Sequence, residues 1–265
     1  MIRSAIILTL AFTVSVQAQT YSIPKKLPLE QAAKRELREW WRTAARYPGL
    51  VPEQLFPIGW SKDGKFAYYY EPVDEACGCY FARLVIQDMR TDKVLWEFKY
   101  NQDDDLDPKT GDMLGQGDIS KLWRKNAKLF SEKLREHGIQ PGRSVLLGKS
   151  FTLGGRSYTG KALTKMGKNA DGEERVDKLW FTLTSPKLGT KTLATDDHSK
   201  EEYWFTLDAA VLGVIKSPFE DRVAVVGMVV NRGCLVRFRE RSEQTLVGDI
   251  AAGSKDGRGH FVEAE

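Results

Sequence analysis

Hydrophobic and polar residues follow two different periods along this chain. Apolar residues recur at three- and four-residue spacing in residues 28–47 and 119–137, which is typical of amphipathic helices. Much of the remaining chain alternates with a period of two, as strands do when one face lies on a core. The pattern therefore predicts an α+β protein, mostly antiparallel sheet, with two amphipathic helices.

The ends of both helices carry local signals. Pro28 suits the first helical position of the first helix, which we expect to end before Pro48. Asp118 suits the N-cap of the second helix, and Gly138 suits the left-handed residue that ends a helix. His137 lies in the last turn, where positive charge is favoured, so we interpret it as a helix-end residue rather than a catalytic base.

Residues 57–100 predict four strands joined by turns. Asp63 and Gly64 supply the first turn, and residues 90–93 supply another. The core positions that we expect here and in a later, similar stretch are Trp60, Phe66, Tyr68, Leu84, Ile86, Leu95 and Leu235.

From Ser144 onward the chain predicts strands almost without interruption, separated by Gly, Pro and Asn turn signals. The Gly-rich, charged residues 252–265 predict a flexible tail. The expected strands are residues 144–147, 157–164, 178–184, 191–194, 203–207, 212–216, 222–230, 235–239 and 245–250.

An internal repeat connects the two halves. Ser217-Pro218 leading to Arg222 parallels Ser61-Lys62 leading to Lys65, with one extra residue. Residues 61–67 (SKDGKFA), 85–88 (VIQD) and 91–96 (TDKVLW) resemble a propeller-blade repeat of the TolB or WD type. This resemblance implies four-stranded antiparallel units and a binding or scaffolding role.

The number of blade-like units sets the expected architecture. Two or three such units fall short of the four or more that a closed propeller needs, so we expect an open pair of sheets. The whole chain also resembles uncharacterised exported bacterial proteins.

Residues 1–18 have the three parts of a signal peptide. A basic start at Arg3 precedes an apolar run in residues 5–14, and Val16-Gln17-Ala18 fits the small-x-small cleavage rule. The apolar run is too short to span a bilayer. We therefore expect a soluble protein of the periplasm or cell exterior. Its regions would be 19–140, with both helices and the first β unit, and 141–251, rich in strands.

Charge limits the possible partners. The formal net charge is +4, from 40 Lys and Arg against 36 Asp and Glu, which lacks the dense basic footprint of a nucleic-acid-binding protein. The first helix carries Lys34, Arg38, Arg42 and Arg46 on one side. That side could contact an anionic envelope surface or simply face water.

Three cysteines predict one disulfide and one free thiol in an oxidising compartment. Cys79 and Cys234 each precede a strand of the repeat, so Cys234 could pair with Cys79 or, less favourably, with Cys77. The alternative is a bridge between Cys77 and Cys79. Three Cys without a suitably spaced His give little support for a zinc site, and we expect no metal or cofactor.

Other motifs fail on spacing. Gly142 and Gly148-Lys149 enclose five residues where a phosphate loop needs four. The acidic residues 103–107 lack the Gly and Glu of a calcium loop. Asp197, His198 and Ser199 are adjacent in sequence, which is not the geometry of a catalytic triad. We therefore expect no catalytic residues among them.

One cluster is a candidate ligand groove. Trp60 and Tyr69 could stack on a sugar ring or a peptide aromatic, with Glu71, Asp74 and Glu75 beside them. The alternative is that these aromatic residues are core residues. The sequence names no reaction. We expect an exported binding or interaction protein with an unknown partner, or alternatively an exported carboxylate-dependent hydrolase of envelope polysaccharide.

Overall fold

The computed structural model describes residues 21–39, 53–72, 80–102, 109–110, 117–169, 172–199, 206–231 and 247–251. Within this part, the chain is an α+β protein with two helices and antiparallel sheets, and its strands form no closed barrel or propeller. No helix in the described residues is long and apolar enough to cross a membrane. The predicted fold class is confirmed.

The first sheet has the strand order β4-β3-β2-β1-β5. Its first four strands follow one another along the chain as antiparallel neighbours, as the alternation predicted. The strands are β1 (Gln54–Trp60), β2 (Lys65–Glu71), β3 (Phe81–Asp88), β4 (Lys93–Asn101) and β5 (Gln140–Pro141).

The second sheet has the order β13-β12-β11-β9-β8-β7, with β10 paired to β9 and β6 paired to β11. The strand β7 was not predicted, and the predicted strand at 212–216 is the end of a longer β11. The strands are β6 (Leu146–Leu147), β7 (Ser150–Leu153), β8 (Arg156–Lys168), β9 (Glu174–Ser185), β10 (Gly189–Asp197), β11 (Thr206–Lys216), β12 (Arg222–Asn231) and β13 (Val247–Ala251).

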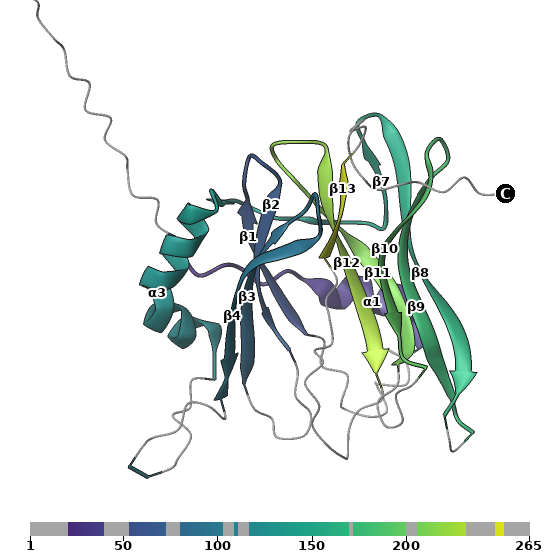
Figure 1. Cartoon of the computed structure of the whole chain (residues 1–265), viewed down its shortest axis with the longest axis horizontal. Helices are drawn as coiled ribbons and strands as arrows, with labels where there is room; N and C mark the ends of the chain where they lie inside the picture. The colour runs from purple at the N-terminus through teal and green to yellow at the C-terminus, as the bar shows by residue number, and fades with distance from the viewer. Residues whose placement is uncertain are drawn as a thin grey trace, which may run out of the picture.

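Both faces of the first sheet are buried (Figure 1). The helix α3 (Ile119–Glu136) covers one face with Leu122, Trp123, Phe130 and Leu134. The helix α1 (Leu29–Glu36), together with β11 and β12, covers the other face. The strand β12 of the second sheet also contributes residues to a core on each of its faces. A strand that is buried on both faces need not alternate between apolar and polar residues, which explains the unbroken apolar run in β12.

The second sheet encloses a third core cluster on the side away from the first sheet. Here β8 and β9 approach β11 and β12 very closely. A Cβ atom at Gly160 would lie 2.8 Å from Val211, and one at Gly227 would lie 2.6 Å from the Phe181 ring. Glycine at these positions lets the two parts of the sheet meet.

Most of the predicted core positions are confirmed, since Trp60, Phe66, Tyr68, Leu84 and Ile86 are buried. The prediction that Leu95 is a core residue is wrong, because its side chain is 40% exposed. β4 is the edge strand, and Leu95 lies on the face opposite to that of Trp96 and Phe98, which pack against the core. Leu235 lies outside the described residues.

The predicted helix ends are partly confirmed. The Asp118 side chain accepts a hydrogen bond from Lys121 N, and Gly138 has φ 68°, with Ile139 N donating to Leu134 O as in a Schellman closure. The predicted first helix is interrupted at Leu37: α1 ends at Glu36, Leu37 has a non-helical φ of −113°, and residues 38–39 are helical again. Residues 40–47 of that prediction lie outside the described residues.

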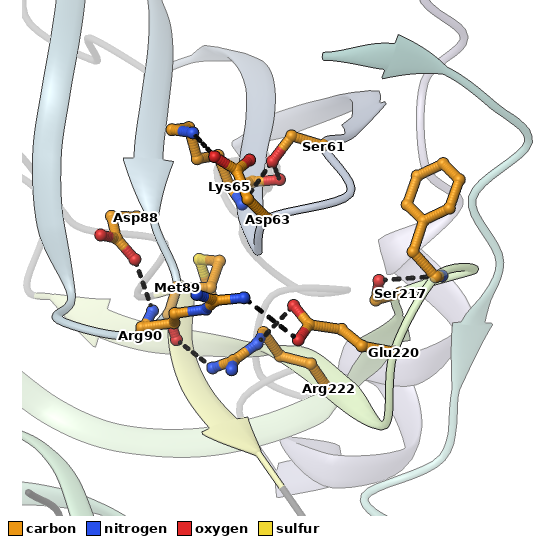
Figure 2. A network of polar contacts seen from close by, with 10 residues as sticks. Ser61, Asp63, Lys65, Asp88, Met89, Arg90, Ser217, Glu220 and Arg222 are labelled. Carbon is orange, nitrogen blue, oxygen red and sulfur yellow. Dashed lines mark hydrogen bonds and ion pairs between the residues drawn. The ribbon is translucent and has the colours of Figure 1, made fainter. Parts of the chain in front are cut away.

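A polar network joins the two sheets where their turns meet (Figure 2). Arg222 donates to Met89 O at 2.9 Å and to Glu220 Oε1 at 2.8 Å, and Arg90 lies 3.7 Å from Glu220. Gly64, with φ 86°, has no side chain to occupy this space: its Cβ would lie 2.7 Å from Glu220. The glycine in this turn of the first sheet therefore leaves room for the second sheet to pack against it.

The two repeat-related turns are closed alike. Ser61 N donates to Lys65 O at 2.9 Å, and Ser217 N donates to Arg222 O at 2.8 Å. The second turn contains the one extra residue that the sequence parallel indicated.

Candidate functional site

The structure does not bring the aromatic residues of the predicted groove together. Trp60 is 2% exposed and packs on Phe66, with 4.7 Å between ring centroids, on the face toward the second sheet. Tyr69 is fully buried on the opposite face, against α3. The alternative interpretation, core aromatics, therefore holds for both. Asp74 and Glu75 lie outside the described residues, as do Cys77, Cys79 and Cys234.

Glu71 remains from that prediction, in a hydrogen-bonded chain of three side chains. The Tyr80 hydroxyl donates to Glu71 Oε1 at 2.7 Å and lies 2.6 Å from the Tyr69 hydroxyl. Tyr80 also lies near Tyr100, with 5.9 Å between ring centroids. This arrangement ties the end of β2 to the start of β3.

Burial sets the protonation of this cluster. It raises the pKa of Glu71 above its ordinary value of 4.5, more than the Tyr80 hydrogen bond and Lys26 lower it. Burial also raises the pKa of Tyr69 and Tyr80, and the Glu71 carboxylate adds to the effect on Tyr80. The two tyrosines are therefore protonated hydrogen-bonding groups at neutral pH, which does not suit the role of a base.

Replacing Glu71 with glutamine should remove one source of pH-dependent stability. Because the folded-state pKa of Glu71 is raised, its stabilising contribution is complete below pH 4.5 and is lost as pH rises through the folded pKa. The unfolding free energy of E71Q minus that of wild type should therefore increase from about pH 4 to about pH 7. Urea unfolding at a series of pH values measures it. A difference that does not change with pH contradicts this assignment.

His198 lies in a polar end of the second sheet. Its Nε2 atom lies 3.3 Å from Thr206 Oγ1 and 3.5 Å from Asp196 Oδ2. Neither contact joins His198 to Ser199, whose hydroxyl donates to Asp197 at 2.5 Å. The structure therefore places these residues in a strand-end network, without the serine–histidine contact of a triad.

A second candidate site, which was not predicted from the sequence, lies on the outer side of β8, β9 and β10. Leu179, Phe181 and Leu183 of β9 point into the third core cluster, so Trp180 points outward. Two rows of paired residues form this surface, which we call the Trp180 face: Leu163, Trp180 and Thr195; Lys165, Lys178 and Asp197. The next row, Lys161, Thr182 and Thr192, contains the buried Thr182.

Trp180 lies in a shallow hollow of about 270 Å³. Of the tryptophans whose side chains the structure describes, Trp180 is the one that belongs to no core cluster. Leu163 beside it is 48% exposed. The hollow is lined by Lys178, Trp180, Thr195, Asp196 and Asp197.

The polar rim of the hollow is fixed by its own contacts. Lys178 Nζ lies 2.9 Å from Asp197 Oδ2. The hydrogen bond from Ser199 and the contact with Lys178 hold the pKa of Asp197 well below its ordinary value, so it stays ionised at neutral pH. The hollow thus offers one aromatic side chain, one hydroxyl group, one cationic donor and two carboxylate acceptors.

A signal for this site was present in residues 178–184, KLWFTLT. Alternation assigns Leu179, Phe181 and Leu183 to one face of the strand. The other face then carries Trp180, Thr182 and Thr184. A large aromatic residue on the polar face of a strand indicates a binding surface more strongly than the aromatics of β2 do.

A larger hollow, of about 380 Å³, lies between the first turn and the end of α3. It is an open, charged depression without an aromatic residue in its lining: Lys62, Asp63, Lys65, Glu136, His137, Gly138 and Gln140. Within the described ranges, no group of three or more His, Cys, Asp or Glu side chains could hold a metal ion.

Comparison with known proteins gives no relative for this chain. No family model, no curated protein and no solved structure matches it. The surfaces of the chain itself are therefore the basis for its proposed function.

Proposed function

We propose that this protein is an exported, non-catalytic binding protein whose ligand-binding surface is the Trp180 face. The observation that carries the proposal is the position of Trp180, outside every core cluster and inside a polar hollow. Binding sites combine such an apolar surface with a few placed polar groups. The signal-peptide pattern of residues 1–18 supports export.

The chemistry of the hollow favours a sugar ring as the ligand. The C–H face of a sugar is apolar and can stack on the negative face of an indole ring. Its hydroxyl groups both donate and accept, which matches Lys178, Thr195 and the two aspartates. Lys178 and Asp197 pair with each other, so the hollow has no excess of cations to select a phosphorylated ligand.

The alternative, a carboxylate-dependent hydrolase, has weaker support. Such chemistry uses two carboxyl groups about the scissile bond. Glu71 has a raised pKa but already accepts a hydrogen bond from Tyr80, and the nearby Asp118 caps α3. If the protein hydrolyses polysaccharide, E71Q should abolish the activity.

Replacing Trp180 with alanine should weaken polysaccharide binding about thirtyfold, because an aromatic anchor at the centre of a site contributes about 2 kcal/mol or more. Binding of the mature protein to a panel of microbial polysaccharides, peptidoglycan included, measures this change. Phe219→Ala is the matched control, since Phe219 is a similarly large, 39% exposed residue in the turn before β12. Equal binding by W180A and F219A, or no binding by wild type, would reject the proposal.

A further inference from the structure

The strand β8 carries two lysines on the outer side of the sheet, where the Trp180 face lies. Lys161, Leu163 and Lys165 alternate along the strand, and Leu163 lies opposite Trp180, so all three side chains point outward. Lys161 and Lys165 are both exposed. They are about 13 Å apart along β8, with one on each side of Leu163.

Neither lysine has an acidic partner in the part of the chain that the structure describes. Lys165 lies directly opposite Lys178 of β9, whose Nζ atom is already 2.9 Å from Asp197 Oδ2. Like charges in such a pair repel, so sheet stability does not account for a lysine at position 165. Residues 138–170 contain no Asp or Glu, so β7, β8 and the turn between them supply no acidic side chain. The charges of Lys161 and Lys165 are therefore not compensated on their own strand.

The acidic residues of β9 have basic neighbours of their own. Asp177 Oδ1 lies 2.9 Å from Arg175 Nε. Glu174 lies opposite Lys168 in the register, toward the end of the hairpin that β8 and β9 form. Neither carboxylate therefore neutralises the two outward lysines of β8.

The carboxylates of the Trp180 hollow lie on the other side of the tryptophan. Asp196 and Asp197 belong to β10, which pairs with β9 along the edge away from β8. Asp197 lies 2.9 Å from Lys178, and Asp196 lies 3.5 Å from His198 Nε2. Trp180 thus separates a cationic strand from a strand that offers acceptors. A sugar ring stacked on Trp180 would direct an anionic group toward β8 and its hydroxyl groups toward β10.

We propose that the ligand of the Trp180 face is a carboxylated glycan whose carboxylate groups contact Lys161 and Lys165. This inference rests on the proposed function and specifies the class of its ligand. Two single cations about 13 Å apart suit separate single charges better than a dense cluster of phosphate or sulfate groups. The carboxylate belongs either to the sugar ring, as in a uronic acid, or to a substituent, as in the peptide of peptidoglycan.

The experiment measures binding of the mature protein to alginate and to soluble peptidoglycan fragments at pH 7. Each ligand is used intact and after its carboxyl groups have been converted to methylamides with a carbodiimide. The test variant is K161Q/K165Q. The matched control, K62Q/K128Q, removes the same charge from two exposed lysines in the first sheet and α3. W180A tests the proposed function on the same ligands.

Wild type and control should bind at least one intact ligand about fivefold more tightly than its amidated form, because each exposed lysine–carboxylate contact contributes about a factor of two. K161Q/K165Q should bind the intact and amidated forms equally, with the affinity of wild type for the amidated form. The ligand that shows the preference, alginate or peptidoglycan, identifies the source of the carboxylate.

Equal binding of intact and amidated ligands by wild type would overturn this inference, as would equal losses in K161Q/K165Q and K62Q/K128Q. Failure of wild type to bind either intact ligand would overturn it too. The proposed function fails separately, if W180A and F219A bind every polysaccharide of the panel equally.

Discussion

Replacing Arg222 with methionine is expected to lower the free energy of unfolding by about 3 kcal/mol. Arg222 is 5% exposed, and its guanidinium group donates both to Met89 O, in the turn between β3 and β4 of the first sheet, and to Glu220 (Figure 2). Methionine keeps much of the side-chain volume but leaves the buried Met89 carbonyl and the Glu220 carboxylate without these donors. Urea unfolding of wild type and R222M measures the difference.

Arg90→Gln is the control for that experiment. Arg90 reaches the same Glu220 carboxylate at 3.7 Å, but its side chain is 51% exposed, so its loss should change stability by no more than about 0.5 kcal/mol. If R222M and R90Q have the same stability, the Arg222 contacts do not hold the two sheets together.

Truncating Phe130 to alanine is expected to cost about 3–5 kcal/mol. Its ring is fully buried. The ring centroid lies 5.0 Å from that of Phe98 in β4 and 5.2 Å from that of Trp123, and both contacts are edge-to-face. Alanine would leave a cavity between α3 and the first sheet. Thermal or urea unfolding monitored by circular dichroism measures the loss.

Leu129→Ala provides the comparison for Phe130, because Leu129 is the adjacent residue on α3 but is 38% exposed. Its loss should cost about 0.5 kcal/mol or less. A small effect of F130A, similar to that of L129A, would mean that α3 does not pack on the first sheet as described.

Local chemistry explains which parts of the fold could be predicted. The N-cap at Asp118 and the left-handed Gly138 depend on residues within one helical turn, so the sequence was sufficient for both. The turn at Gly64 and the alternation in β2 were equally local. The exposed Leu95 was not predictable in this way, because its burial depends on whether a helix or second sheet reaches the edge strand β4.

The burial of the two aromatic residues of the candidate groove could not be predicted for a related reason. Alternation assigns Trp60 and Tyr69 to faces of strands but does not show that both faces of the first sheet are covered. Glu71 was singled out, but its partner Tyr80 lies in another strand, so their contact required the register of β2 and β3. The position of Trp180 on the polar face of β9, by contrast, follows from alternation alone.

The most direct test of the proposed binding surface is a nuclear magnetic resonance titration of the mature protein with soluble peptidoglycan fragments. The indole N–H signal of Trp180, assigned with W180F, and the backbone amide signals of Lys178, Thr195 and Asp197 should shift together and saturate with ligand. Indole signals of the buried Trp60 and Trp123 should not shift. Shifts confined to Glu71 and Tyr80, or no saturable shift around Trp180, would contradict the account.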